Sequence, residues 1–584
     1  MTTVSVWAPR PKRVEIAVGD ERRPLTAQPG GWWSTNLPPS EEQRDYAFVL
    51  DGGDPRPDPR SAWQPHGVDG PSRLVDHGAF PWTDADWRGL PLAGSVLYEM
   101  HVGTFTPEGT FDAAVERLDH LVELGIDAVE LLPCNAFAGE RGWGYDGVAW
   151  YAVHDPYGGP EGLKRFVDAC HARGVGVVMD VVYNHLGPAG NYRPEFGPYL
   201  TEAHHTPWGP AVNLDMPGSD EVRRFLLDNV RMWLRDYHVD GLRLDAVHAL
   251  VDERATHLLE EMSVEVEALG AQLRKPLFLV AESDLNNAGV VTSREAGGYG
   301  LDGQWADDVH HALHVTLTGE TSGYYTDFGG LDVLAKVLRD VFLHDGTWSS
   351  FRGRSHGRPV APTVPGHRFV TYLQDHDQVG NRMAGDRLSM HLSDGLLKTG
   401  AALLLTSPFT PMLWMGEEWG ARTPWLFFSD HSGELGEAVR KGRRSEFAGH
   451  GWETEDIPDP QAEGTFRRSQ LDWSEVDDER GKDLLGWYRQ LIALRRQRPE
   501  LSDGRRDRVE VVWDDAERWL VVRRGDVAVA CNLSGERRSL PLPAPPVRVL
   551  ATSTSGFVFA EAAVQTDAES AVVLELVPPA RPGP

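Results

Sequence analysis

Residues 95–105 have the sequence SVLYEMHVGTF, and residues 175–185 have the sequence VGVVMDVVYNH. Between these runs lie FDAAVERLDHLVELG (111–125), IDAVELLP (126–133) and GLKRFVDACHARG (162–174). The short runs are mainly apolar, whereas the longer ones repeat apolar residues every three to four positions. This alternation predicts strands that are buried on both faces and separated by amphipathic helices, and therefore a parallel sheet.

The alternation continues toward the carboxyl terminus and adds five strand candidates to the first three. They are GLRLDAVH (241–248), LFLVAES (277–283), LDGQWADD (301–308), FVTYLQDHD (369–377) and FTPMLWMGEE (409–418). Eight such units favour a closed (β/α)8 TIM barrel, an α/β fold, over an open doubly wound sheet.

The sequence on either side of these units has the shorter rhythm of β structure. Near the amino terminus, VSVWAP, RVEIAV and DYAFVL alternate with Gly and Pro turns, which predicts an immunoglobulin-like β-sandwich. After the helical stretch 484–501, the β pattern returns. We therefore expect three domains, a β-sandwich over 1–90, the barrel over 91–502 and a carboxyl-terminal β domain over 503–584.

Composition limits the partners that this chain can have. The formal charge of −30 over 584 residues argues against nucleic acid and anionic membrane surfaces, which attract clustered Lys and Arg. The sequence contains no apolar run long enough for a membrane helix and no recognisable export signal. Its three cysteines are scattered singly, which suits a reducing cytoplasm. A cytoplasmic protein with a neutral substrate is the expectation.

A barrel predicts that catalytic groups lie at the carboxyl ends of its strands. Four strand ends carry such groups: Asp180, Asn184 and His185; Arg243, Asp245 and His248; Glu282; and His376 and Asp377. Asp245 follows GLRL and Glu282 follows LFLVA, so each carboxylate ends a run that should be buried. Charged groups are rarely buried unless they are paired or functional.

Two carboxyl groups in different environments are what glycoside hydrolysis needs. One must be ionised to attack the anomeric carbon, and the other must keep a proton for the leaving oxygen. Arg243 lies two residues before Asp245 on the same strand face, where it can orient that carboxylate and keep it ionised. A separation of about 5 to 5.5 Å between the two carboxyls would make the enzyme retaining.

At these positions the chain resembles the α-amylase superfamily of glycoside hydrolases, through the motifs DVVYNH, GLRLDAVH, VAES and DHDQ. The resemblance implies that Asp245 is the nucleophile, that Glu282 is the general acid and base, and that Asp377 binds ring hydroxyls of a distorted sugar. It also implies that Arg243 orients Asp245. Three further substrate contacts are implied, namely His185, His376 and Tyr145 of GWGYDG.

Within the superfamily, the resemblance is greatest to enzymes that release trehalose from maltooligosyltrehalose by cutting the adjacent α-1,4 bond. The segment TPMLWMGEEWGARTPWLFFSDH (410–431), followed by GRRSEF, is the most diagnostic feature. We expect the trehalose end to be recognised between Glu417 and His431. The candidate aromatic walls there are Trp419, Trp425, Phe427 and Phe428, and the candidate hydroxyl partners are Glu417, Arg422, Asp430 and His431.

Several alternatives remain open at this point. A glycogen branching enzyme would share the catalytic residues but transfer the chain to a sugar hydroxyl, and a debranching enzyme is a weaker choice. A catalytically silent glucan-binding protein is a third, although all three catalytic carboxylates are present. Related amylases often hold calcium near the position of Asn184, but no further ligands can be located in the sequence. We expect no required metal and no cofactor.

Overall fold

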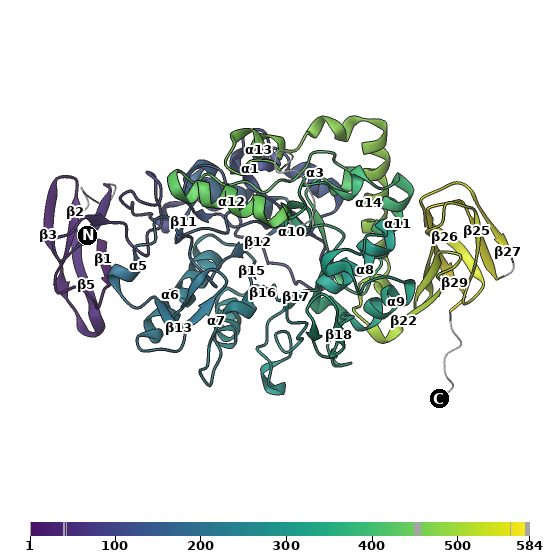
Figure 1. Cartoon of the computed structure of the whole chain (residues 1–584), viewed down its shortest axis with the longest axis horizontal. Helices are drawn as coiled ribbons and strands as arrows, with labels where there is room; N and C mark the ends of the chain where they lie inside the picture. Colours follow the sequence, from purple (N-terminus) through teal and green to yellow (C-terminus); the bar gives the residue numbers. More distant parts are fainter. Residues whose placement is uncertain (1, 39–40, 42–43, 449–456, 561, 579–584) are drawn as a thin grey trace.

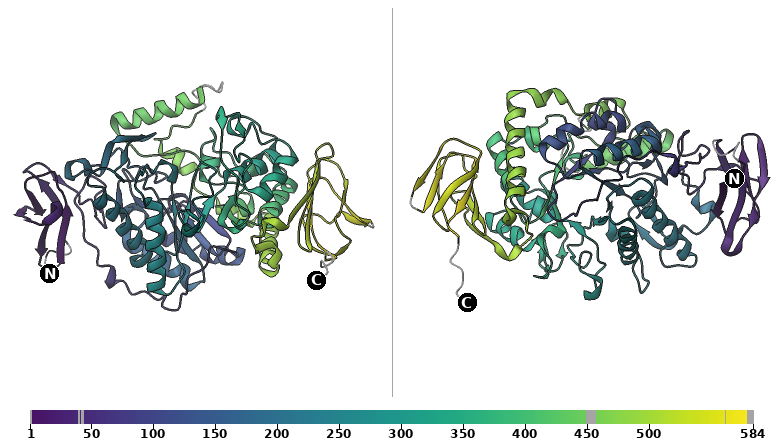
Figure 2. Two further views of the ribbon diagram at one scale, coloured as in Figure 1. Left: turned by 90° about the horizontal axis from the view of Figure 1, so that it is seen from below. Right: turned by 180° about the vertical axis from the view of Figure 1, so that it is seen from behind.

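The computed structural model describes residues 2–38, 41, 44–448, 457–560 and 562–578. A barrel forms the centre of the molecule, with the amino-terminal strands at one end and the carboxyl-terminal strands at the other (Figure 1). The views in Figure 2 show the same order of three parts from below and from behind. The predicted fold class, a TIM barrel between two β regions, is confirmed.

Eight parallel strands close the barrel, and the last of them pairs with the first. They are β8 (Leu97–Met100), β9 (Ala128–Leu131), β12 (Gly176–Val181), β15 (Gly241–Leu244), β16 (Phe278–Ala281), β17 (Gly303–Trp305), β20 (Phe369–Tyr372) and β21 (Thr410–Trp414). Each strand lies within one of the eight predicted segments. Short, continuously apolar strands of this kind occur where other parts of the protein cover both faces of the sheet.

Helices cover the outside of the barrel. The main ones are α3 (Leu118–Leu124), α4 (Gly159–Ala172), α6 (Ser219–Arg231), α7 (Leu258–Leu273), α8 (Asp307–Thr318), α9 (Leu331–Asp340), α11 (Asp394–Leu405) and α14 (Glu479–Gln497). The connection from β16 to β17 differs, because its only helical element is the 3-10 turn Arg294–Ala296. After β21, helix α12 (Gly433–Ala448) lies across the upper side of the barrel in Figure 1.

The barrel interior changes from apolar to polar along the strands. Leu97, Ala128 and Val178 belong to an apolar cluster that is closed from below by Leu90 and Leu92. Two residues further along the same strands, side chains of the same face are Glu99, Glu130 and Asp180, joined by Arg243 of β15. All four are almost fully buried. The polar layer therefore lies immediately beneath the carboxyl ends of the strands.

The amino-terminal region consists of two antiparallel sheets. One has the order β1-β5-β4 and the other β3-β2-β6-β7. Their strands are β1 (Thr2–Trp7), β2 (Val14–Val18), β3 (Glu21–Pro24), β4 (Thr26–Ala27), β5 (Trp32–Leu37), β6 (Tyr46–Leu50) and β7 (Pro55–Arg56). Between Arg56 and Leu97 the chain is mostly irregular and lies against the barrel, where Trp87 donates a hydrogen bond to Asp240. The expected boundary at residue 90 falls in this segment.

The carboxyl-terminal region is also built from two antiparallel sheets, with the orders β22-β23-β24-β29-β26 and β25-β28-β27. Their strands are β22 (Val509–Asp514), β23 (Trp519–Arg524), β24 (Val527–Asn532), β25 (Arg538–Pro541), β26 (Pro546–Thr552), β27 (Phe557–Ala560), β28 (Ala563–Thr566) and β29 (Ser570–Leu576). Buried Arg524 joins this region to the barrel by donating to the carbonyls of Thr406 and Ser407. Across the described residues, no helix has the length and apolar character required to span a membrane.

Candidate active site

Two carboxylates stand side by side at the rim of the barrel. Asp245 is the first residue after β15, and Glu282 is the first residue after β16. Because the register pairs Leu244 with Ala281, the two strands end at the same height. The side chain of Asp245 is 12% exposed and that of Glu282 is 19% exposed, so both are accessible only from the mouth of the barrel.

The guanidinium group of Arg243 lies beneath both carboxylates and has no solvent exposure. Its Nη1 donates to Asp245 Oδ1 at 2.7 Å and to Asp180 Oδ2 at 2.9 Å. Its Nη2 lies 3.7 Å from Glu282 Oε2. A buried guanidinium needs anionic partners of this kind. The predicted orientation of Asp245 by Arg243 is therefore matched by a direct contact.

Asp245 and Glu282 have different local environments. Asn184 Nδ2 donates to the second oxygen of Asp245 at 2.7 Å, so both oxygens accept hydrogen bonds that stabilise a carboxylate. For Glu282, burial is the main influence and, together with the charge of Asp245, outweighs the attraction of Arg243. The pKa of Glu282 is raised to about 8, and this carboxyl therefore holds a proton at neutral pH.

The residue that follows Asp245 has an unusual backbone conformation. Ala246 has a φ of +40°, in the left-handed region, and its backbone N–H donates to Glu282 Oε2 at 2.6 Å. A left-handed conformation is costly for a residue with a Cβ and is found mainly where function requires it. This turn aims an N–H at the carboxyl and fixes its direction.

The third carboxylate, Asp377, lies in the first turn of α10 (His376–Gly380), after β20. Its side chain is 49% exposed, and His376 Nε2 lies 3.5 Å from its Oδ2. His376 is buried, and its Nδ1 donates to Glu99 Oε1 at 2.5 Å. Burial alone would lower the pKa of His376, but Asp377 and Glu99 raise it to about 10. The imidazole is therefore cationic at neutral pH.

Tyr145 lies in the loop that follows β9. Its hydroxyl donates to Asp180 Oδ2 at 2.6 Å, and its ring stacks on His376 with the centroids 5.1 Å apart. Gly144 makes this placement feasible, because it has a φ of +99° and a Cβ there would lie 2.2 Å from the carbonyl oxygen of Pro133. The predicted aromatic contact is thus fixed beside the predicted histidine.

His185 and His248 occupy different positions at the rim. His185 is buried, donates from Nδ1 to Asn184 Oδ1 at 2.5 Å and stacks on Trp208. Burial lowers the pKa of His185, so this ring is neutral at pH 7. His248 is exposed and accepts the backbone N–H of Asp284. It belongs to the mouth of the barrel and, in the described structure, forms no hydrogen bond or ion pair with Asp245 or Glu282.

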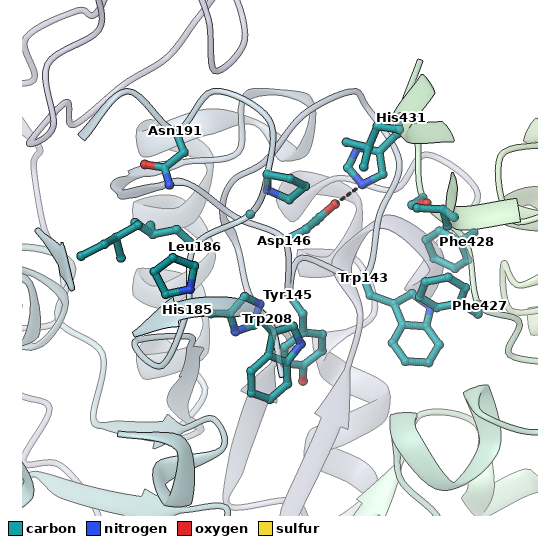
Figure 3. Close-up of a pocket in the computed structure, with 17 residues that line it drawn as sticks. Trp143, Tyr145, Asp146, His185, Leu186, Asn191, Trp208, Phe427, Phe428 and His431 are labelled. Carbon is teal, nitrogen blue, oxygen red and sulfur yellow. Dashed lines mark ion pairs between the residues drawn. The ribbon is translucent and has the colours of Figure 1, made fainter. Parts of the chain in front are cut away.

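A cavity of about 520 Å³ opens beside these residues. Tyr145 and His185 line it, together with Trp143, Trp208 and Phe427, so its walls are largely aromatic (Figure 3). The ion pair between His431 and Asp146, 2.7 Å long, joins its upper wall to the loop that carries Tyr145. Flat apolar walls with few polar groups suit the faces of sugar rings.

The segment from Glu417 to His431 only partly follows the prediction. Phe427, Phe428 and His431 line the cavity, as expected of wall and hydroxyl-binding residues. Trp419 and Trp425 do not, because they are fully buried in the core. Glu417 is also buried and accepts a hydrogen bond from Tyr488. The hydrophobic effect explains why the two tryptophans turn inward. Glu417 is instead accommodated by its hydrogen bonds from Tyr488 and Gln374.

Two further polar residues of this segment, Asp430 and Arg422, form hydrogen bonds with other parts of the protein. Asp430 accepts hydrogen bonds from Arg141 at 2.6 Å and from the backbone of Glu140 at 2.9 Å. Arg422 is exposed, and its backbone N–H donates to Glu475. The expected hydroxyl partners Glu417, Arg422 and Asp430 are thus not among the residues that line the cavity.

The side chain at the position where related amylases hold calcium is hydrogen-bonded to protein groups here. The amide of Asn184 donates to Asp245, and its oxygen accepts from His185, so both polar groups of the side chain have protein partners. Calcium requires several oxygen ligands around one point. The described part of the chain holds no group of three or more His, Cys, Asp or Glu residues that could bind a metal.

Two residues of the site were not selected from the sequence. Glu99 lies inside β8, two residues before the strand ends, and a rule based on strand ends passes over it. Trp208 lies at the turn between β13 (Leu200–Thr206) and β14 (Gly209–Val212), outside the barrel strands. Glu99 is the one charged residue in the run SVLYEM (95–100), and this position could have marked it as functional. No comparable signal marked Trp208.

Comparison with known proteins agrees with this geometry. Residues 78–197 match the model of the alpha amylase catalytic domain, and residues 504–574 match a domain of unknown function, DUF3459. A solved structure from Salmonella typhimurium, provisionally called an alpha amylase, is 37% identical, with a TM-score of 0.89 over 98% of this chain and 97% of that one.

Curated relatives are more specific. The malto-oligosyltrehalose trehalohydrolase of Arthrobacter ramosus is 57% identical over 90% of this chain and 92% of that protein. Relatives of the same name in other organisms are 42–54% identical. The 1,4-alpha-glucan branching enzyme of Bacillus anthracis is only 26% identical, over 91% of this chain and 79% of that protein. The chain belongs to the malto-oligosyltrehalose trehalohydrolase family of the α-amylase superfamily.

Proposed function

We propose that this enzyme hydrolyses the α-1,4-glucosidic bond next to the terminal trehalose of maltooligosyltrehalose and releases trehalose with retention of configuration. The names of relatives that share 42–57% of their residues support this substrate. One observation carries the chemistry: Asp245 and Glu282 stand beside the same guanidinium, yet both oxygens of Asp245 accept hydrogen bonds, whereas burial raises the pKa of Glu282 to about 8.

These two states correspond to the two roles in a retaining mechanism. Asp245 attacks the anomeric carbon, the bond to the leaving oxygen breaks, and Glu282 transfers its proton to that oxygen. The glucan is then bound to Asp245 as an ester, and trehalose is the leaving group. In the second step Glu282, now ionised, takes a proton from water, and the hydroxide attacks the same carbon to release the glucan and free Asp245.

The surrounding residues bind the ring that carries this carbon. Asp377 is open to the site and is suited to accept hydrogen bonds from two neighbouring ring hydroxyls, while cationic His376 donates from Nε2 beside it. The ring of Tyr145 forms an apolar floor, and His185 contributes a neutral imidazole. Arg243 keeps Asp245 oriented throughout.

Glycogen branching is the nearest alternative, because it uses the same covalent intermediate. The much lower identity to a branching enzyme favours hydrolysis. Product analysis tests the choice directly. The enzyme is incubated separately with maltopentaose and with a trehalose-capped maltooligosaccharide, and free trehalose from the capped substrate is the expected product. New α-1,6 branches, or equal cleavage of both substrates at internal bonds, would contradict the proposal.

We place this reaction in the cytoplasm. Cys134, Cys170 and Cys531 are all buried free thiols, which are compatible with a reducing compartment. The substrate is a neutral oligosaccharide, which is consistent with a strongly acidic chain that has no need to attract phosphate.

A further inference from the structure

Glu99 is joined to the catalytic rim by one residue. It lies on β8 inside the barrel, and its side chain and that of His376 are each only 1% exposed. Its Oε1 accepts from His376 Nδ1 at 2.5 Å, and its Oε2 accepts from the backbone N–H of His376 at 3.1 Å. Both oxygens therefore contact the same residue, and they fix the direction of the imidazole ring.

With Nδ1 engaged, the other ring nitrogen of His376 is directed to the site. Among the described residues, Nε2 has no hydrogen-bond acceptor, and it lies 3.5 Å from Asp377 Oδ2. The face of the ring is covered by Tyr145. The imidazole can neither rotate nor exchange its nitrogens without breaking the contact to Glu99.

Several charged or titratable groups face His376. They are Glu99, Glu130, Asp180, His101, Asp375 and Asp377. Burial, and next the proximity of Glu99, raise the pKa of Glu130 and of Asp375 well above the usual range, which favours the neutral form of both carboxyls. Burial lowers the pKa of His101 to about 3, so it is neutral. Burial raises the pKa of Asp180 to about 6, and this carboxyl is paired with Arg243. Glu99 and Asp377 are the carboxyl groups within ion-pair distance of His376.

Glu130 provides an internal comparison for Glu99. The two residues are paired in register on adjacent strands, and each is 1% exposed. In the described part of the chain Glu130 forms no hydrogen bond or ion pair with His376, and its Oε2 has no hydrogen-bond partner. Two glutamates at the same level of the barrel are therefore equally buried, but Glu99 alone of the two is hydrogen-bonded to the histidine.

We propose that Glu99 is a positioning residue for the hydrolysis, and that it holds His376 as a cation whose Nε2–H points at the hydroxyls of the reacting ring. The inference rests on the proposed function, because it assigns His376 to that ring. A neutral imidazole that donates from Nδ1 to Glu99 would have no hydrogen on Nε2, which could then only accept, whereas the cation donates from both nitrogens and keeps Nε2–H for the sugar. A charged donor also binds a sugar hydroxyl more strongly than a neutral one.

The test compares Glu99→Gln with the matched control Glu130→Gln. Each replaces one buried carboxyl by an amide of the same shape, but only the first removes a charge from His376. The ratio kcat/KM is measured from about pH 5 to about pH 9.5 on the trehalose-capped substrate. Thermal unfolding of both full-length variants is followed in parallel.

Glu99→Gln is expected to lower kcat/KM roughly 10- to 100-fold at neutral pH. In the wild-type enzyme the alkaline limb lies near pH 8, where Glu282 loses its proton, and His376 titrates above it. Without Glu99, His376 should lose its proton before Glu282 does, and the limb should move below pH 8. Glu130→Gln is expected to change kcat/KM less than about threefold, with an unmoved limb. If Glu99→Gln does not fold, Glu99→Asp keeps the charge and should keep the wild-type limb.

An unmoved limb in folded Glu99→Gln, or a moved limb in Glu99→Asp, would overturn the proposal. The double variant that combines Glu99→Gln with His376→Asn adds an independent check. It should be no slower than His376→Asn alone if Glu99 acts through the histidine, whereas additive losses would reject that route. Should the wild-type enzyme release no trehalose, the proposed function fails, but the same comparison on maltopentaose still tests Glu99.

Discussion

The strand ends after β15 and β16 and the segment after β21 differ in how closely the structure follows the sequence. Both regions are predicted to face the substrate. Asp245 and Glu282 do meet at the rim, within reach of Arg243. In the segment from Glu417 to His431, some residues line the cavity while Trp419 and Trp425 are buried.

The difference reflects what determines the direction of a side chain. In a barrel, every second residue of a strand points inward, so the position on the strand fixes where Asp245 and Glu282 point. After β21 the chain is irregular, and each residue turns according to burial. Trp425 stacks on Trp143, one layer behind the cavity. Residue type alone does not separate a wall from the core behind it.

The largest effects should come from the strand-end pair. Asp245→Asn and Glu282→Gln keep the shape of the side chain and remove the nucleophilic charge or the transferable proton. Each should reduce kcat by roughly a thousandfold or more. Wild-type kcat/KM should also fall above about pH 8, because Glu282 must be protonated to act as the acid and its pKa is raised to about 8.

Circular dichroism and thermal unfolding serve as controls for these two variants. Near-normal turnover in either folded variant would contradict the catalytic role that we assign to the strand ends after β15 and β16.

Trp425→Ala should act on the fold. Its indole is fully buried against Trp143 and Phe428, and truncation of a buried Trp to Ala costs about 3 to 5 kcal/mol of unfolding free energy. Urea unfolding measures this cost. The ratio of kcat/KM for capped and plain substrates should stay close to wild type in the folded fraction. A selective loss on the capped substrate at unchanged stability would restore Trp425 as a recognition residue.

Phe427→Ala should show the opposite pattern. Phe427 lines the cavity and is only partly buried, so its loss should cost less stability than that of Trp425. We expect kcat/KM on the trehalose-capped substrate to fall about tenfold more than on a plain maltooligosaccharide of equal length. Competition between the two substrates measures this ratio. Equal losses on both would show that the segment after β21 only supports the fold.

The smallest effect is expected from chelation. Dialysis against EDTA should leave kcat/KM unchanged, because both polar groups of Asn184 already have protein partners and the chemistry uses carboxyl groups alone. Rates before and after treatment, with and without added calcium, are compared. Loss of activity that added calcium restores would show that the active site needs this ion, and would contradict the prediction.

Much of the barrel and of its rim could be predicted from the sequence. Periodicity placed all eight strands, and the position after a buried run singled out Asp245 and Glu282. The contact between Glu99 and His376 could not be predicted, since it joins residues 277 positions apart and depends on barrel closure. The stacking of Trp208 on His185 likewise depends on where a hairpin folds back.

The protonated state of Glu282 also affects how the chain binds protons when it folds. In the unfolded chain a glutamate ionises near its ordinary pKa of about 4.3, whereas the folded protein retains this proton up to about pH 8. Folding between these values therefore takes up a proton at Glu282. The stability that this group contributes is fully present below the unfolded pKa and is lost as the pH rises through the folded one, by about 1.4 kcal/mol per unit. The proton that Glu282 needs for catalysis thus makes the free energy of unfolding fall as the pH rises. Glutamine at this position would remove this pH dependence, but it would also remove the catalytic acid.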